Sequence, residues 1–184
     1  MIYTFSEDSK LLLDSAILIL SNTKNIKKVL EMGCGPAEVL TMLSQKFPSL
    51  EFTGADINRD ALKVAKENIR KTKTKIKIIH SDLFSNIDEK FDLILFNPPY
   101  LPHDKEFFDE SLHGGPRGNE TSIRFLKEAT DHLNKNGRII LLTSSVSHPE
   151  EILNYAKGLG FAVQKIKDEK LFFEVLTTYL FIKP

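Results

Sequence analysis

The sequence predicts an α/β fold whose seven-stranded, mostly parallel sheet has one antiparallel strand and helices on both faces. Short apolar runs of strand length alternate along the chain with stretches of helical periodicity, which is the rhythm of such sheets. Residues 91–96 are almost continuously apolar, as expected of a central strand that is buried on both faces. Only about five residues separate the last two strands, which is too short for a crossover, so these strands must be antiparallel neighbours.

Local signals mark the ends of the individual elements. Pro48 stops the second helix, because proline cannot continue the helical ladder, and Asp60 is the expected cap of the third. Asn136 and Gly137 are the expected stop of the fourth helix, and Pro149 opens the fifth. These signals place helices at 10–21, 38–47, 60–70, 121–133 and 149–158. They place strands at 28–32, 51–57, 75–80, 91–96, 138–143, 161–166 and 172–182.

The composition is that of one ordinary globular domain covering residues 1–184. The 25 basic and 25 acidic side chains cancel, so no bulk field draws the chain to nucleic acid or to a membrane. Cys34 is the only cysteine, which excludes a disulfide within the chain. The longest nearly apolar run, residues 11–20, is about half a membrane span, and no basic region leads into an apolar one at the start, so we expect a cytoplasmic protein.

Two stretches have an unusual composition. Residues 61–78 hold seven basic side chains and one acidic side chain, which indicates a solvated helix face or, alternatively, a docking patch for an acidic partner. Residues 101–120 are rich in glycine, proline and charge. Loops of this length are usually functional, so we expect this one to be mobile in the free protein and to order over a bound substrate.

A glycine-rich turn follows the first strand and contains Glu31, Gly33, Cys34 and Gly35. Glycine allows positive φ and lets the backbone pass close to a ligand, while the helix start that follows offers unpaired N–H groups. Plain strand–helix turns also use glycine, so this turn alone is weak evidence for a nucleotide site. Because no base lies nearby in the sequence, Cys34 is better explained as a small packing residue than as a nucleophile.

Two carboxylates follow at the ends of the next two strands. Asp56, with Ile57 after it, lies about twenty residues beyond the glycines, which is the spacing that ribose recognition requires. Asp82 and Leu83 end the third strand, where a carboxylate and a neighbouring amide could read an adenine amino group. A helix cap or a turn would explain Asp82 equally well.

The residues Asn97, Pro98, Pro99 and Tyr100 follow the fourth strand, beside the switch point where ligands bind in such sheets. The prolines stiffen the backbone and leave carbonyls without a local partner. The Asn97 amide oxygen and the Pro98 carbonyl can both accept from one NH2 group, and Tyr100 offers a flat face for stacking. We therefore predict that Asn97, Pro98 and Tyr100 form a catalytic holder for a planar nitrogen, which needs no metal.

The glycine turn, the two strand-end aspartates and Asn97–Tyr100, in this order, resemble the motifs of Rossmann-like class I methyltransferases that modify a planar nitrogen. Residues 5–14 and 114–126 are similar to the amino-terminal signature and the Gly-Gly loop of the HemK/PrmC group in its archaeal and eukaryotic form. The resemblance implies S-adenosylmethionine as the cofactor. The implied cofactor-binding residues are Glu31, Gly33, Cys34, Gly35, Asp56, Ile57, Asp82, Leu83 and Asn97.

Members of the HemK/PrmC group methylate the side-chain nitrogen of the glutamine in the Gly-Gly-Gln loop of class 1 translation release factors. The resemblance therefore implies a protein-glutamine N5-methyltransferase with a release factor as its substrate. The chain departs from the group at Ser6, where proline is usual, and in the residue order of 116–119. It also lacks the helical amino-terminal domain of the bacterial members, and some members without that domain use a small zinc-binding activator subunit.

An edge strand is the expected docking place for such an activator. Strand order in this class of methyltransferase puts residues 75–80 at a sheet edge, with Ile76 and Ile78 on one face and Lys73, Lys75 and Lys77 on the other. An exposed edge can accept a strand from another chain. The alternative is that these lysines only guard the edge against aggregation.

Other functions stay open on the sequence alone. The same residues would suit the exocyclic amine of adenine, so the main alternative is an adenine-N6 methyltransferase that acts on DNA or RNA. Zero net charge and the lack of a target-recognition domain argue against duplex DNA and make nucleic acid the less favoured substrate. Further alternatives are methylation of another protein side chain or of a small molecule. The chain could also be a non-catalytic partner subunit, but the intact Asn97–Tyr100 motif argues against that role.

Overall fold

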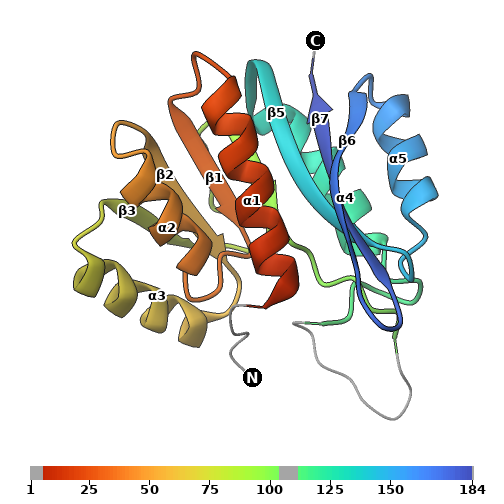
Figure 1. Ribbon diagram of the computed structural model, residues 1–184, viewed down its shortest axis with the longest axis horizontal. Coiled ribbons are helices and arrows are strands. Elements are labelled where there is room, and N and C mark those ends of the chain that lie inside the picture. Colours follow the sequence, from red (N-terminus) through yellow and green to blue (C-terminus); the bar gives the residue numbers. More distant parts are fainter. Residues whose placement is uncertain (1–5, 104–111, 184) are drawn as a thin grey trace.

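The structure, a computed structural model, describes residues 6–103 and 112–183 and forms a single seven-stranded sheet with helices on both faces (Figure 1). The helices are α1 (Glu7–Asn22), α2 (Glu38–Lys46), α3 (Arg59–Thr72), α4 (Glu120–Ala129) and α5 (Pro149–Gly158). The strands are β1 (Lys28–Met32), β2 (Glu51–Asp56), β3 (Ile76–His80), β4 (Phe91–Phe96), β5 (Leu133–Ser144), β6 (Ala162–Lys170) and β7 (Val175–Ile182).

The sheet has the predicted topology. Its order is β3-β2-β1-β4-β5-β7-β6, and the first five strands in this order are parallel. Strand β7 is antiparallel to both of its neighbours, β5 and β6, so it is the one reversed strand. The order confirms that β3 is an edge strand and that β1 and β4 lie side by side near the middle, where the carboxyl ends of the strands can form a crevice.

The core consists of two apolar layers, one on each face of the sheet. Helices α1, α2 and α3 pack on the face that presents Leu93 and Leu95 of β4. Helices α4 and α5 pack on the opposite face, which presents Ile94 and Phe96. Alternate side chains of a strand point to opposite faces, so the continuous apolar run of β4 is explained by burial on both sides, as predicted.

Two of the expected helix signals are wrong. The cap of α3 is Asn58, whose side chain accepts from the backbone N–H groups of Asp60 at 2.9 Å and Ala61 at 3.2 Å, while Asp60 pairs with Lys63. Asn136 does not stop a helix. Helix α4 already ends at Ala129 and passes through a short 3-10 turn (Thr130–His132) into β5.

Tertiary pairing explains the second error. Leu133 is buried and pairs with Phe91 of β4, so the chain is extended from that point, and Asn136 takes a positive φ inside the strand. Likewise, β6 is longer and β7 shorter than expected, because a tight turn closed by Leu171 N–H to the Glu174 carbonyl at 2.8 Å joins them. Phe172, expected in a strand, is 92% exposed at this turn.

The amino-terminal helix is part of the core. The apolar run 11–20 lies within α1, whose leucines pack against the sheet together with α2. None of the helices in the described part of the chain is long and apolar enough to cross a membrane.

Candidate active site

A cavity of about 460 Å³ opens at the carboxyl ends of β1, β2 and β4, and its size lies in the usual range of small-molecule sites. The structure brings all the predicted site residues to its wall. These are Glu31, Gly33, Cys34, Gly35, Asp56, Ile57, Asp82, Leu83, Asn97, Pro98 and Tyr100. They come from four separate strand ends, so the sheet topology alone places them together.

The glycine turn is locked to the end of β2 by Asp56. The Gly35 N–H donates to one oxygen of the Asp56 carboxylate at 2.7 Å, and the Asn58 N–H donates to the other at 2.7 Å. Gly35 has a φ of 49°, and a Cβ built on it would meet no atom of the described residues within 4 Å. No side chain therefore separates the Gly35 backbone from the cavity. Each Asp56 oxygen can also accept a further hydrogen bond.

Gly33 lies against Phe96, the residue that precedes Asn97. It has a φ of 63°, and a Cβ on it would lie 3.3 Å from the ring of Phe96, the last residue of β4. A side chain at this position would therefore be strained in its backbone and would press on the residue before Asn97.

Glu31 is buried at the end of β1 with an unsatisfied carboxyl oxygen. Its exposure is 5%, and its Oε2 has no hydrogen-bond partner among the described residues. Burial, aided by the negative charge of Asp56, raises the pKa of this carboxyl well above its ordinary value. An ammonium group at this point would satisfy the carboxylate, and S-adenosylmethionine carries one. The bare glycine backbone, Asp56 and this carboxyl together fit that cofactor.

Cys34 shows the packing role that the sequence indicated. The side chain is buried beside Gly54, whose close approach leaves no room for a Cβ there. Burial, followed by the charges of Glu31 and Asp56, raises the pKa of its thiol well above the ordinary value. The neutral thiol is therefore a poor nucleophile.

The buried Glu31 should make the free protein more stable at acidic pH. Between the ordinary pKa of glutamate and the raised pKa of Glu31, the folded chain keeps a proton that the unfolded chain has released, so stability falls as pH rises through this window. Glu31→Gln should remove that dependence and raise Tm at neutral pH, by about 2–4 °C for each kcal/mol recovered. Melting curves from acidic to neutral pH, with the exposed Glu67→Gln as control, measure this. A variant with the parent's pH profile would contradict it.

Asp82 and Leu83 line the same cavity, and Asp82 has a partner that sequence reasoning missed. Arg124 of α4 forms an ion pair with Asp82 and a second with Glu128 at 3.2 Å. Leu83 is buried with a φ of 44°, a conformation that is costly for leucine. Arg124 also lines the cavity. Its pairing across 42 positions has no local signal in the sequence.

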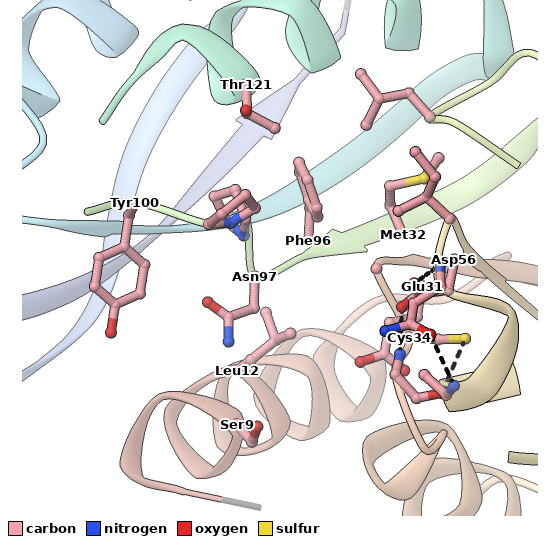
Figure 2. Close-up of a pocket in the computed structure, with 18 of the residues that line it drawn as sticks. Ser9, Leu12, Glu31, Met32, Cys34, Asp56, Phe96, Asn97, Tyr100 and Thr121 are labelled. Atoms are coloured by element: carbon pink, nitrogen blue, oxygen red, sulfur yellow. Dashed lines mark hydrogen bonds between the residues drawn. The ribbon is translucent and has the colours of Figure 1, made fainter. Parts of the chain in front are cut away.

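Asn97 is held by the first helix. Its Nδ2 donates to Oδ2 of Asp8 at 3.0 Å, and its Oδ1 is buried without a hydrogen-bond partner among the described residues. Figure 2 shows its side chain directed toward α1, with Tyr100 on one side and the glycine turn on the other. Asn97 lines the cavity, and its unused amide oxygen could accept from an incoming N–H group.

The segment 114–119, here called the Gly-Gly segment, packs directly on the backbone that follows Asn97. A Cβ on Gly114 would lie 2.3 Å from the Pro99 carbonyl oxygen, and one on Gly118 would lie 2.4 Å from that of Tyr100. The Gly114 N–H also donates to the Leu101 carbonyl at 3.0 Å. These glycines permit close packing of the two backbone segments. The predicted mobility covers residues 101–120, of which 104–111 lie outside the described residues, so it stays a prediction.

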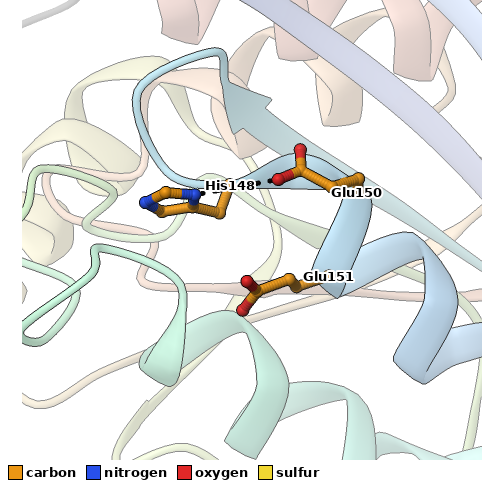
Figure 3. Close-up of side chains that lie close together, drawn as sticks. All are labelled: His148, Glu150 and Glu151. Atoms are coloured by element: carbon orange, nitrogen blue, oxygen red, sulfur yellow. Dashed lines mark ion pairs between the residues drawn. The ribbon is translucent and has the colours of Figure 1, made fainter.

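Three side chains that could bind a metal, His148, Glu150 and Glu151, lie together at the start of α5 (Figure 3). Glu151 already accepts hydrogen bonds from Arg117 and, at 3.1 Å, from Asn119. These contacts tie the Gly-Gly segment to α5. Glu151 therefore has a structural role, and His148 pairs with Glu150 at 3.7 Å.

The fold and this cavity define a class I S-adenosylmethionine-dependent methyltransferase. The chain belongs to the methyltransferase small domain family, whose sequence profile matches residues 5–172. This confirms the predicted fold class, the enzyme class and the cofactor.

Curated relatives and solved structures agree with this assignment. A Methanocaldococcus jannaschii protein, provisionally named a protein N5-glutamine methyltransferase, is 38% identical over 180 residues that cover 95% of this chain and 88% of the relative. Human methyltransferase HEMK2 is 31% identical over 169 residues that cover 86% and 79%. A chain of the E. cuniculi Mtq2–Trm112 complex, which methylates the termination factor eRF1, has a TM-score of 0.78 at 23% identity and covers 99% and 98% of the two chains.

Proposed function

We propose that this protein methylates the side-chain amide nitrogen of a protein glutamine, in the Gly-Gly-Gln loop of a class 1 translation release factor. The observation that carries the proposal is the buried Oδ1 of Asn97, a residue of the cavity wall, because this oxygen has no hydrogen-bond partner among the described residues. An amide NH2 group supplies the donor that this oxygen lacks. The name of the M. jannaschii relative supports a protein glutamine as the acceptor, and that of the E. cuniculi complex supports a termination factor as the substrate.

In this proposal the glycine turn would hold the cofactor. Asp56 would accept from its ribose hydroxyls, Glu31 would face its ammonium group, and Asp82 with Leu83 would border its adenine. When bound, S-adenosylmethionine supplies an electrophilic methyl group, whose bond to sulfur breaks as the bond to the acceptor nitrogen forms. Cys34 and Ile57 complete the wall of the cofactor side.

The acceptor amide lies on the other side of Asn97. Asn97 Oδ1 and the Pro98 carbonyl accept from its two N–H groups, and Tyr100 stacks on its plane. These contacts fix the nitrogen in line with the methyl group, so positioning and exclusion of water provide most of the rate enhancement. The same acceptors stabilise the positive charge that grows on nitrogen before its proton leaves to water.

Labelled cofactor and three candidate acceptors test the function. The acceptors are the cognate release factor, its Gly-Gly-Gln to Gly-Gly-Ala variant, and bulk nucleic acid. We expect label only in the unmodified release factor. Label in nucleic acid would establish the adenine alternative, and equal label in both forms of the release factor would place the modification on another side chain.

We further propose that a small activator protein pairs with the edge strand β3. The support is the exposed edge, which offers unpaired backbone groups, together with the second chain in the E. cuniculi complex. Of the three lysines predicted along this edge, Lys75 is the best candidate for a contact with the activator. Lys73 is the αL cap of α3 rather than part of the strand, and Lys77 pairs with Glu89 at 2.6 Å. Lys75, just before β3, is exposed.

Reversing the charge of Lys75 should weaken this pairing. Lys75→Glu leaves the Lys77–Glu89 pair intact, so we expect about a tenfold weaker association with the activator, typical of a lost charge contact at an interface, without a lower Tm. Lys170→Glu makes the same change at the opposite edge strand, β6, and is the matched control. Pull-down and titration measure the effect. Equal association of both variants, with cross-links elsewhere, would contradict docking on β3.

A further inference from the structure

Asp8 joins the first turn of α1 to the catalytic asparagine. It is 3% exposed and lines the cavity, although it precedes Asn97 by 89 positions. One carboxylate oxygen, Oδ1, accepts from the Ser9 N–H at 2.6 Å and from the Ser6 hydroxyl. The other oxygen, Oδ2, accepts from Asn97 Nδ2 at 3.0 Å.

The contact decides which way the Asn97 amide faces. An ionised carboxylate only accepts hydrogen bonds, so it selects the NH2 end of the amide and repels the oxygen end. The oxygen is thereby directed away from Asp8, which agrees with its burial without a partner among the described residues. A reversed amide would present its NH2 to an acceptor nitrogen that itself carries N–H groups, and two donors would then oppose each other.

We infer that Asp8 is a positioning residue for methyl transfer, which holds the Asn97 amide with its oxygen toward the acceptor. The inference rests on the proposed role of Asn97. Local capping of α1 does not account for the contact, because the hydrogen bonds from Ser6 and Ser9 go to Oδ1, whereas Asn97 donates to Oδ2. Negative charge at a helix start is favourable in itself, but it does not require a contact with Asn97.

A double-mutant cycle separates positioning from mere support of the fold. Asp8→Ala should lower kcat by about tenfold to a hundredfold, the usual cost of a misplaced reacting group, while the cofactor Kd stays within about twofold. In the Asn97→Ala background the same change should lower kcat by less than about twofold, because Asp8 acts through Asn97. Glu7→Ala, which removes an exposed carboxylate from the same helical turn, should have no effect on kcat. If the double variant loses kcat by the product of the two single fold-losses, Asp8 acts independently of Asn97 and the inference is wrong.

A second readout does not depend on the substrate. The side-chain NH2 signals of Asn97, identified by their loss in Asn97→Ala, should shift in the nitrogen–proton NMR spectrum of Asp8→Ala and stay in place in Glu7→Ala. If the signals do not move in Asp8→Ala, the contact itself is wrong. If they move but the release factor is not methylated by the parent protein, the positioning contact stands and the proposed substrate fails.

Discussion

Replacing Asn97 with alanine should lower kcat for methyl transfer at least about a hundredfold, or about 2.7 kcal/mol in the barrier, and leave the fold and most of the cofactor affinity intact. The substitution removes the buried oxygen that we assign to the acceptor nitrogen and that has no partner in the described part of the chain. It also leaves one oxygen of Asp8 without its donor. Single-turnover methylation of the release factor measures the first effect, and calorimetry with the cofactor measures the second.

The control for this variant is Asn22→Ala. Asn22 ends the same helix that holds Asn97, but its side chain donates to the Leu18 carbonyl within that helix. It should retain full activity. If Asn97→Ala stays within about threefold of the parent, a barrier change under about 0.7 kcal/mol, the catalytic role of Asn97 is excluded.

The Asp56→Ala variant should bind S-adenosylmethionine about 10- to 150-fold more weakly, as expected for a lost charge-assisted hydrogen bond of about 1.5–3 kcal/mol. Two effects combine here. The carboxylate no longer accepts from the ribose, and the Gly35 N–H loses the contact that locks the glycine turn. Asp60→Ala, four residues further on and paired only with a surface lysine, is the matched control. Calorimetry gives both affinities.

A cofactor analogue that lacks the ribose 2′-hydroxyl separates the two effects. If Asp56 binds the ribose, the analogue should bind the parent more weakly than the natural cofactor does, and this difference should vanish in Asp56→Ala. If the difference persists, Asp56 acts only through the turn. Unchanged affinity of the variant for the natural cofactor would remove Asp56 from the site altogether.

The grouping of the predicted residues around one cavity could be predicted from the sequence because its signals are local. The glycines, Asp56 and Asn97 each stand at the end of an apolar strand run, and parallel strands end at the same edge of a sheet. The contact between Gly35 and Asp56 follows from that arrangement. By contrast, Asp8 and Arg124 enter the cavity from helices, and nothing in their own sequence neighbourhoods tells where those helices pack.

Competing local signals account for the remaining differences. Asn58 and Asp60 are both good caps, and only the extended backbone of Asn58 decides between them. Asn136 carries a turn signal that is overridden by the pairing of Leu133 with Phe91. Gly114 and Gly118 lie in the loop that we predict to be mobile, and in the structure they let two backbone segments touch. Glycine in a sequence does not distinguish these two uses.

The contact of Gly33 with Phe96 limits how such a catalytic centre could be redesigned. The glycine turn packs against the end of β4, just before Asn97–Tyr100. A Cβ on Gly33 would lie 3.3 Å from the Phe96 ring. A protein designer who transplanted Asn97–Tyr100 to another α/β scaffold would also need a glycine with positive φ at the position of Gly33. The two motifs form a single engineering unit, and a combinatorial library that varied them separately would contain mostly inactive members.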